Sequence, residues 1–268
     1  MGKDKLFGAI ETRDVGVTIK SARELEFMRQ AGSVVARTIN KLTKELKPGM
    51  TTSDLDDIAV SEIKNMGAKP SFKGYLGFPR TICTSINNEI VHGIPGDRVI
   101  QDGDLVKMDV GAVVGGFHGD SAVTIGAGNI PPESSKLISI TKEALNKGIA
   151  EAQAGKRIGD ISWAIQSFVE SEGYSVVRQY VGHGIGKNLH EEPQIPNFGQ
   201  PGTGPLLRKG MVIAIEPMVN IGGWETEVLN DNWTVVTADG SLSAHFENTL
   251  AITDGEAEVL TLYRERDN

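Results

Sequence analysis

The sequence contains little of several residue types, and each shortage excludes a class of protein. Its one cysteine, Cys83, excludes an intrachain disulfide and fits a reducing compartment such as the cytoplasm. No window approaches the roughly 18 apolar residues of a membrane span, and the N-terminus lacks the apolar segment of a signal peptide. Basic residues number 27 against 35 acidic ones, and this net charge of −8 argues against nucleic acid as the main partner. We therefore expect a cytoplasmic globular enzyme or binding protein.

The chain of 268 residues contains an internal repeat. One match, at an offset of 106 positions, pairs Gly49, Asp54 and Gly67 with Gly155, Asp160 and Gly173. At an offset of 107, a second set recurs: Gly103, Asp109 and Gly115-Gly116 as Gly210, Glu216 and Gly222-Gly223. We expect one domain over 1–268, with a short N-terminal segment of about 1–14 and repeat halves roughly at 20–125 and 130–253.

Hydrophobic periodicity predicts helices in pairs and strands in separate groups. A helix follows the cap candidate Ser21, a second begins near Ser53 or Asp54, and their copies are predicted near 134–152 and 160–172. Strand-like runs are predicted near 80–85, 104–113, 117–125, 176–182, 211–219, 233–238, 244–253 and 258–263. This grouping favours an α+β fold over an alternating α/β fold.

The stretch KMDVGAVVGGFHGDSAVTI, residues 107–125, predicts a hairpin around a Gly115-Gly116 turn. In that register Asp109 faces Ala122 and Asp120 faces Gly111, so the two carboxylates are diagonal neighbours on one face, with small residues opposite them that leave room between. Such a pair could share a proton, share metal ions or stand in water at a solvent-facing edge.

Further acids and histidines favour the metal alternative. Glu216 lies in the apolar run MVIAIEPMV, and Glu247 lies in LSAHFENTLAIT, so four acids in all are predicted in strands. Because isolated buried carboxylates cost tens of kcal/mol, two divalent cations would balance four of them. His183, close to His190 in the chain, is a candidate partner.

Several motifs together resemble one known family. INNEIVHGIPGDRVIQDGDLVKMDVG, GFHGD, GHGIGKNLHEEP, IEPM and FENT are similar to the motifs of type I methionine aminopeptidases, over nearly all of residues 15–265. These are pita-bread metallohydrolases, and the resemblance implies two pseudo-symmetric α+β halves. It also implies removal of the N-terminal methionine from nascent proteins and peptides, preferring a small second residue, by attack of a metal-bridging hydroxide on the first peptide bond.

The resemblance assigns roles residue by residue. The implied ligands of two divalent ions are Asp109, Asp120, His183, Glu216 and Glu247. Asp120 and Glu247 would bridge the ions, Asp109 would chelate one of them, and His183 with Glu216 would complete the other. One imidazole and four carboxylates suit Co²⁺, Mn²⁺ or Fe²⁺ at least as well as Zn²⁺.

The same resemblance places residues around the substrate. Glu216 would handle the proton, His190 would stabilise the carbonyl oxygen, and His92 would lie near the scissile amide. The methionine pocket would be lined by Tyr75, Phe78, Cys83, Leu189 and Trp233. His118 and His245 receive no family role and are predicted to be structural.

Two positions depart from the family pattern. Leu189 replaces the aromatic residue of FHEEP, which puts the tightness of substrate binding in question. Asn248 replaces the histidine of FEHT beside Glu247, which could change the tuning of the metals.

Two alternative functions stay open. One is a proline-specific aminopeptidase or dipeptidase, whose separate N-terminal domain we do not expect here. The other is a non-catalytic pita-bread binding module, which would have lost ligands. Partners are N-termini that begin with Met; no membrane or nucleic acid is expected, we expect a monomer, and ribosome association stays open.

Overall fold

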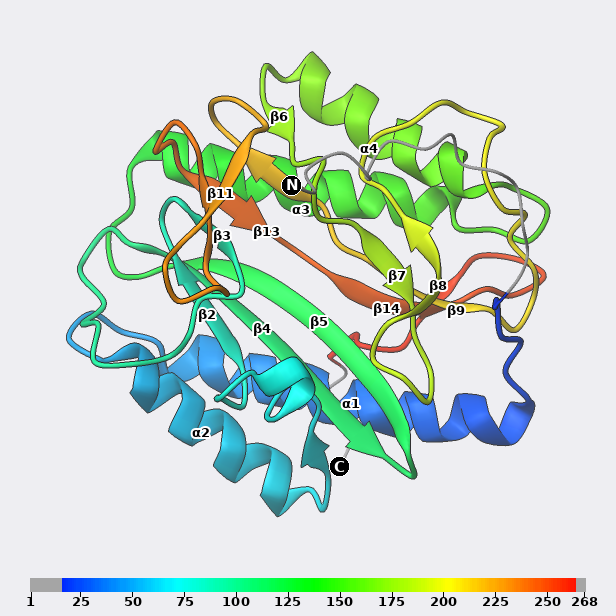
Figure 1. Ribbon diagram of the computed structural model, residues 1–268, viewed down its shortest axis with the longest axis horizontal. Helices are drawn as coiled ribbons and strands as arrows, with labels where there is room; N and C mark the ends of the chain where they lie inside the picture. The colour runs from blue at the N-terminus through cyan, green and yellow to red at the C-terminus, as the bar shows by residue number, and fades with distance from the viewer. Residues whose placement is uncertain (1–15, 264–268) are drawn as a thin grey trace, which may run out of the picture.

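The computed structural model describes residues 16–263, and its elements confirm the predicted α+β class (Figure 1). The helices are α1 (Ala22–Glu45), α2 (Thr52–Asn65), the 3₁₀ helix η1 (Tyr75–Gly77), α3 (Pro132–Glu151) and α4 (Ile158–Ser171). The strands before α3 are β1 (Lys69–Pro70), β2 (Cys83–Ile86), β3 (Glu89–Val91), β4 (Leu105–Val114) and β5 (Phe117–Gly126). Those after α4 are β6 (Ser175–Val176), β7 (Gly182–Gly184), β8 (Glu191–Ile195), β9 (Val212–Ile215), β10 (Met218–Asn220), β11 (Thr226–Val228), β12 (Val235–Thr237), β13 (Ser243–His245), β14 (Asn248–Ala251) and β15 (Glu258–Val259).

The helix pairs lie on opposite outer sides of the strands. Figure 1 shows α1 and α2 along one side and α3 and α4 along the other. One apolar core lies under α1 and α2 and includes Leu42 and Val106, and another lies under α3 and α4 and includes Leu145 and Ile213. Each pair therefore buries one apolar side against strands, as layered architectures require. No helix in the described part of the chain is both long and apolar enough to cross a membrane.

The start of the second helix differs by a few residues from the prediction. The N-cap is Thr51, and Asp54 occupies the third helical position, where its Oδ2 accepts a hydrogen bond of 2.7 Å from the Thr51 amide. The matching Asp160 accepts one of 2.8 Å from the amide of Arg157 at the start of α4. The repeated aspartate therefore satisfies an otherwise unpaired amide at each helix start.

The backbone repeats at the same two offsets, 106 and 107. The amide of Gly49 donates to the Ile100 carbonyl at 2.8 Å, and the amide of Gly155 donates to the Leu207 carbonyl at 3.0 Å. Both glycines have φ near +92°, a conformation that other residues adopt only under strain. The sequence repeat thus corresponds to repeated turns and helix starts.

Several predicted strands are shorter or divided. The runs predicted at 176–182, 211–219 and 244–253 each split into two strands: β6 with β7, β9 with β10, and β13 with β14. The first half contains a sheet ordered β1-β4-β2, in which β5 also pairs with β4, and the second half contains a sheet ordered β15-β14-β9-β7-β8. The divisions matter for the site, because two of its acids lie at them.

Candidate metal centre

The β4–β5 hairpin has the predicted register. Asp109 pairs with Ala122 and Gly111 pairs with Asp120, on either side of a turn whose glycines have φ of 59° and 84°. Positive φ at both turn residues matches the right-handed twist of a hairpin. The two carboxylates are therefore diagonal neighbours on one face. The expected space at Gly111 is filled, because a Cβ there would lie 2.6 Å from the ring of Phe72.

Glu216 and Glu247 do not lie inside strands, contrary to the prediction. Glu216 lies between β9 and β10, and Glu247 lies between β13 and β14. Because Ile215 pairs with Asn248, both glutamates emerge at the same end of the β9–β14 ladder. The Glu247 amide also donates to the Ala122 carbonyl at 2.9 Å, which joins this end to the first hairpin. Acids from both halves of the chain thus meet at one place.

His183, on β7, completes a compact donor group. One oxygen each of Asp120 and Glu247 and one nitrogen of His183 lie within 4.8 Å of one another, and all three residues are buried. Nδ1 of His183 lies 2.8 Å from the Gly184 carbonyl, so it carries the proton and Nε2 is free to bind a cation. Nε2 lies 3.6 Å from Glu216 Oε1.

Unpaired oxygens make this centre suitable for a cation. Oδ1 of Asp109, Oδ1 of Asp120 and Oε1 of Glu247 are buried without a hydrogen-bond partner. Buried polar atoms are almost always paired, and a set of unpaired carboxylate oxygens is what a divalent ion would coordinate. The residues present therefore fit a metal.

The raised pKa values of the four carboxyl groups also fit a site for cations. Burial raises the pKa of Asp109 to about 7, and burial together with the charges of Glu247 and Asp109 raises the pKa of Asp120 well above its usual range. The pKa values of Glu216 and Glu247 are raised well above theirs by burial first and neighbouring carboxylates second. Like charges this close cannot all ionise alone, whereas cations would allow it.

Two further histidines lie at the edge of the donor group. His190 Nδ1 lies 2.7 Å from the Tyr75 hydroxyl, and its ring centroid lies 4.3 Å from that of His183. His92 adopts φ of 61° and stands edge-on to the ring of Trp233 at 6.4 Å. Burial, followed by the nearby His190, lowers the pKa of His92 to about 4, so its imidazole is neutral at pH 7.

The predicted pocket residues share one apolar cluster, which we call the central cluster. It contains Tyr75, Phe78, Cys83, Leu189 and Trp233 together with residues of α1, β5 and β9. The rings of Phe78 and Trp233 meet edge-on at 5.0 Å. Cys83 pairs with Asp109 across β2 and β4, so the central cluster adjoins the acids directly.

Sequence reasoning missed three contributors to this centre. His245, predicted to be structural, is 1% exposed, and its Nε2 lies 3.8 Å from Glu216 Oε2. The Thr249 hydroxyl binds both the amide and the carbonyl of Asp120, at 3.0 and 2.7 Å, and the Ser121 hydroxyl donates to the Glu247 carbonyl at 2.5 Å. Each lies within two residues of a predicted ligand in the chain, and this proximity was the available signal.

Asn248, which departs from the family pattern, and His118, which has no family role, each have a hydrogen-bond partner other than the four acids. Asn248 Oδ1 accepts a hydrogen bond of 2.8 Å from the Thr261 hydroxyl. His118 Nδ1 lies 2.9 Å from the Ser71 hydroxyl.

Comparisons with known proteins agree with this geometry. The model of metallopeptidase family M24 matches residues 26–254. The methionine aminopeptidase of Clostridium acetobutylicum is 55% identical over 92% of this chain and 99% of its own length, and methionine aminopeptidase 1 of Bacillus subtilis is 55% identical over 91% and 99%.

Solved structures agree with the fold. The crystal structure of methionine aminopeptidase from Thermotoga maritima superposes with a TM-score of 0.91 at 47% identity, over 92% of this chain and 100% of that one. Prolidase from Pyrococcus furiosus shares the fold alone, with a TM-score of 0.75 at 23% identity, over 92% of this chain and 66% of that one. These matches confirm the predicted pita-bread fold and the resemblance on which it was based. The chain belongs to metallopeptidase family M24.

Proposed function

We propose that this enzyme is a methionine aminopeptidase that removes the N-terminal methionine from proteins and peptides whose second residue is small. The observation that carries the proposal is the group of unpaired, buried carboxylate oxygens around His183, beside an apolar cluster. The relatives at 55% identity that carry this name support the reaction.

Divalent metal use follows from membership of a metallopeptidase family, and we propose two ions per chain. Asp109, Asp120, His183, Glu216 and Glu247 would hold them. This oxygen-rich set suits Co²⁺, Mn²⁺, Fe²⁺ or Zn²⁺. When bound, such ions polarise a carbonyl and lower the pKa of water.

The chain's own residues would orient the substrate and move protons. His190, fixed by the Tyr75 hydroxyl, would donate to the oxygen of the first peptide bond, where charge develops. Neutral His92 would contact the scissile amide. Glu216, between His183 and His245, would carry the proton that passes to the leaving amine.

The central cluster would supply the methionine pocket. Its rings, from Tyr75, Phe78 and Trp233, offer sulfur–aromatic contacts to a thioether, and buried Cys83 and Leu189 would close the wall. Burial first, then the charge of Asp109, raises the pKa of Cys83 well above its usual range, so the thiol is neutral and lines the wall as an apolar group.

We also propose that the enzyme works as a single catalytic domain, as a monomer in the cytoplasm, on nascent chains. Its one cysteine and net charge of −8 support this setting. Sedimentation of the purified protein would test the monomer, and co-sedimentation with ribosomes would test the open question of ribosome association.

One experiment tests the function and its alternatives together. Protein stripped by a chelator should lose hydrolysis of Met-Ala-Ser and regain it when Mn²⁺, Fe²⁺, Co²⁺ or Zn²⁺ is added singly. Cleavage of Ala-Pro-Ser in preference to Met-Ala-Ser would instead identify a proline-specific enzyme. Metal binding without either activity would identify a binding module, and full activity in metal-free protein would contradict the metal mechanism.

A further inference from the structure

A buried lysine stands on β4 next to the metal centre. Lys107 is 2% exposed and lies two residues before Asp109, so both side chains leave the strand on the same face. Lysine is almost never fully buried unless its ammonium has partners. The metal chemistry proposed above gives Lys107 no task.

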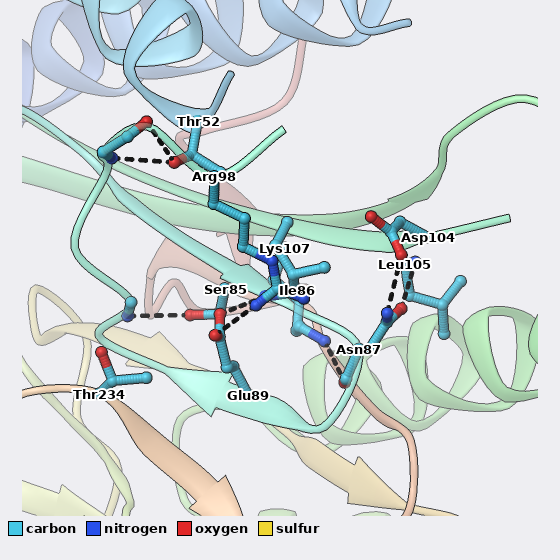
Figure 2. Close-up of polar contacts among 12 residues, drawn as sticks. Thr52, Ser85, Ile86, Asn87, Glu89, Arg98, Asp104, Leu105, Lys107 and Thr234 are labelled. Carbon is cyan, nitrogen blue, oxygen red and sulfur yellow. Dashed lines mark hydrogen bonds and ion pairs between the residues drawn. The ribbon is translucent and has the colours of Figure 1, made fainter. Parts of the chain in front are cut away.

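The partners of this ammonium are backbone carbonyls. Nζ donates to the Asn87 carbonyl at 2.6 Å, drawn in Figure 2, and to the Ser243 carbonyl at 2.9 Å. The nearby carboxylate of Glu89 is occupied by the Ile86 amide and by Arg98, each at 2.6 Å. Among residues 16–263 no carboxylate forms an ion pair with Lys107, so the direct partners of Nζ are these two carbonyl oxygens.

The two carbonyls belong to different halves of the molecule. Asn87 lies in the turn between β2 and β3, and Ser243 begins β13. The Ser243 amide donates to the same Asn87 carbonyl at 3.2 Å, and the Thr237 amide donates to Asn88 at 3.0 Å. The β2–β3 turn is thus a point where the first half meets the second, and the ammonium lies at that junction.

The chain leads directly from this junction to the proposed site. In the first half, Cys83 is four residues before Asn87 and His92 is five after it. In the second half, Glu247 is four residues after Ser243. A change in the separation of Asn87 and Ser243 would therefore move His92 relative to Glu247.

Both carbonyl oxygens lie within hydrogen-bond distance of Nζ, so one donor group serves both and offsets the repulsion between them. An ammonium carries three donors, so it can bind both oxygens at once. An apolar side chain of equal length would leave the buried Ser243 oxygen without this donor and the Asn87 oxygen with the Ser243 amide alone. The choice of lysine is therefore not neutral packing.

We propose that Lys107 is a positioning residue, whose ammonium ties the β2–β3 turn to β13 and so sets the placement of His92 and Glu247 around the metals and the substrate. The proposal rests on the proposed aminopeptidase function. A purely stabilising role is the competing explanation, and the two differ in what a neutral variant loses.

The test compares Lys107→Met with Thr141→Val. Thr141 is buried in α3, far from the four acids in the chain, and its hydroxyl donates to the Leu137 carbonyl. Thr141→Val therefore removes one buried side-chain hydrogen bond. Lys107→Met should weaken binding of the second equivalent of Mn²⁺ by about tenfold, measured by calorimetry. It should also lower kcat on Met-Ala-Ser by roughly 10- to 100-fold at saturating Mn²⁺, as losses of groups behind metal ligands do. Thr141→Val should leave both within about twofold.

Chemical rescue supplies a readout that a purely stabilising role would not give. In Lys107→Ala the missing atoms correspond to n-propylammonium, which should restore part of kcat, whereas neutral n-propanol should not. The wild-type enzyme assayed in the same amine corrects for competition with the substrate's own N-terminus.

Two results would overturn the proposal: a lower melting temperature with metal affinity and kcat unchanged, or an absence of rescue by the amine. Failure of the aminopeptidase function would be recognised separately, because the wild-type enzyme itself would then show no metal-dependent cleavage of Met-Ala-Ser.

Discussion

The two halves present their acids on different kinds of backbone. In the first half, Asp109 and Asp120 stand on an unbroken ladder from Leu105 to Val114. In the second half, Glu216 and Glu247 stand where strands are interrupted. Strand register sets the facing of the first pair, whereas Glu247 of the second pair is held by hydrogen bonds that cross to the first half.

This difference shows what the internal repeat preserves. Helix starts and turns recur, as in the matched aspartates Asp54 and Asp160 and the matched glycines Gly49 and Gly155. The acids do not recur in equivalent surroundings: Asp109 is inside a strand, and its counterpart Glu216 follows one. A symmetric scaffold thus carries an asymmetric set of donors, and substitutions in the two halves should have different consequences.

The largest effect is expected when an acid of the unbroken ladder is neutralised. Asp109→Asn should lower metal affinity and kcat/KM by more than about 100-fold, since losses of groups behind the ligands already cost 10- to 100-fold. The metal-free protein should become more stable, because a carboxyl whose pKa burial raises to about 7 is replaced by a neutral amide.

The measurement is the melting temperature with and without Mn²⁺. The melting temperature of the wild-type protein should rise when Mn²⁺ is added. The melting temperature of Asp109→Asn should be higher than that of the wild type without metal and should rise little when Mn²⁺ is added. A metal-induced gain equal to that of the wild type would remove Asp109 from the ligand set.

A smaller loss is expected at His190, which stands outside the acids. His190→Ala should keep its metal and lose roughly 100-fold in kcat, as expected for a missing donor to the developing oxyanion. Tyr75→Phe removes only the hydroxyl that lies 2.7 Å from His190 Nδ1, so it should lose less, about tenfold. Metal content and kcat measured on the same samples separate these roles, and loss of metal from His190→Ala would contradict them.

The sequence predicted one half of the site better than the other, for physical reasons. A two-glycine turn and strict alternation determine the β4–β5 register, so the facing of Asp109 and Asp120 followed from local rules. The interruption after Glu216 had a signal in Pro217, which lacks the amide that a ladder needs. The interruption at Glu247 had none, because it depends on pairing with Ala122, more than a hundred residues away in the chain.

A third prediction tests that dependence on the other half. Ser121→Ala removes the hydroxyl that donates to the Glu247 carbonyl but leaves the β4–β5 ladder intact. Metal affinity should fall by about tenfold, since the backbone of a ligand loses a support. Thr141→Val is the matched control for loss of a buried hydroxyl and should leave metal affinity unchanged. Calorimetric titration with Mn²⁺ measures both; equal affinities in the two variants would mean that the Ser121 hydroxyl is not needed to place Glu247.

The smallest effect is expected at Leu189, which lies beside the site without being a ligand. It is 2% exposed in the central cluster, so a larger side chain must displace its neighbours. Leu189→Phe should therefore lower stability by about 1–3 kcal/mol through overpacking. It should also narrow the pocket and raise the preference for Met-Ala-Ser over Leu-Ala-Ser by about 1 kcal/mol, the lower end for one contact in an apolar pocket.

The decisive quantity is the ratio of kcat/KM values for the two peptides, because a general loss of folded enzyme lowers both equally and leaves their ratio unchanged. Leu189→Met serves as the control, since it keeps nearly the same volume and should change neither the ratio nor the bound metal. A higher ratio in Leu189→Phe with unchanged Mn²⁺ binding would place Leu189 in the wall of the pocket. An unchanged ratio with lower stability would show instead that Leu189 only fills the core, so that the departure from FHEEP would have no bearing on the choice of substrate.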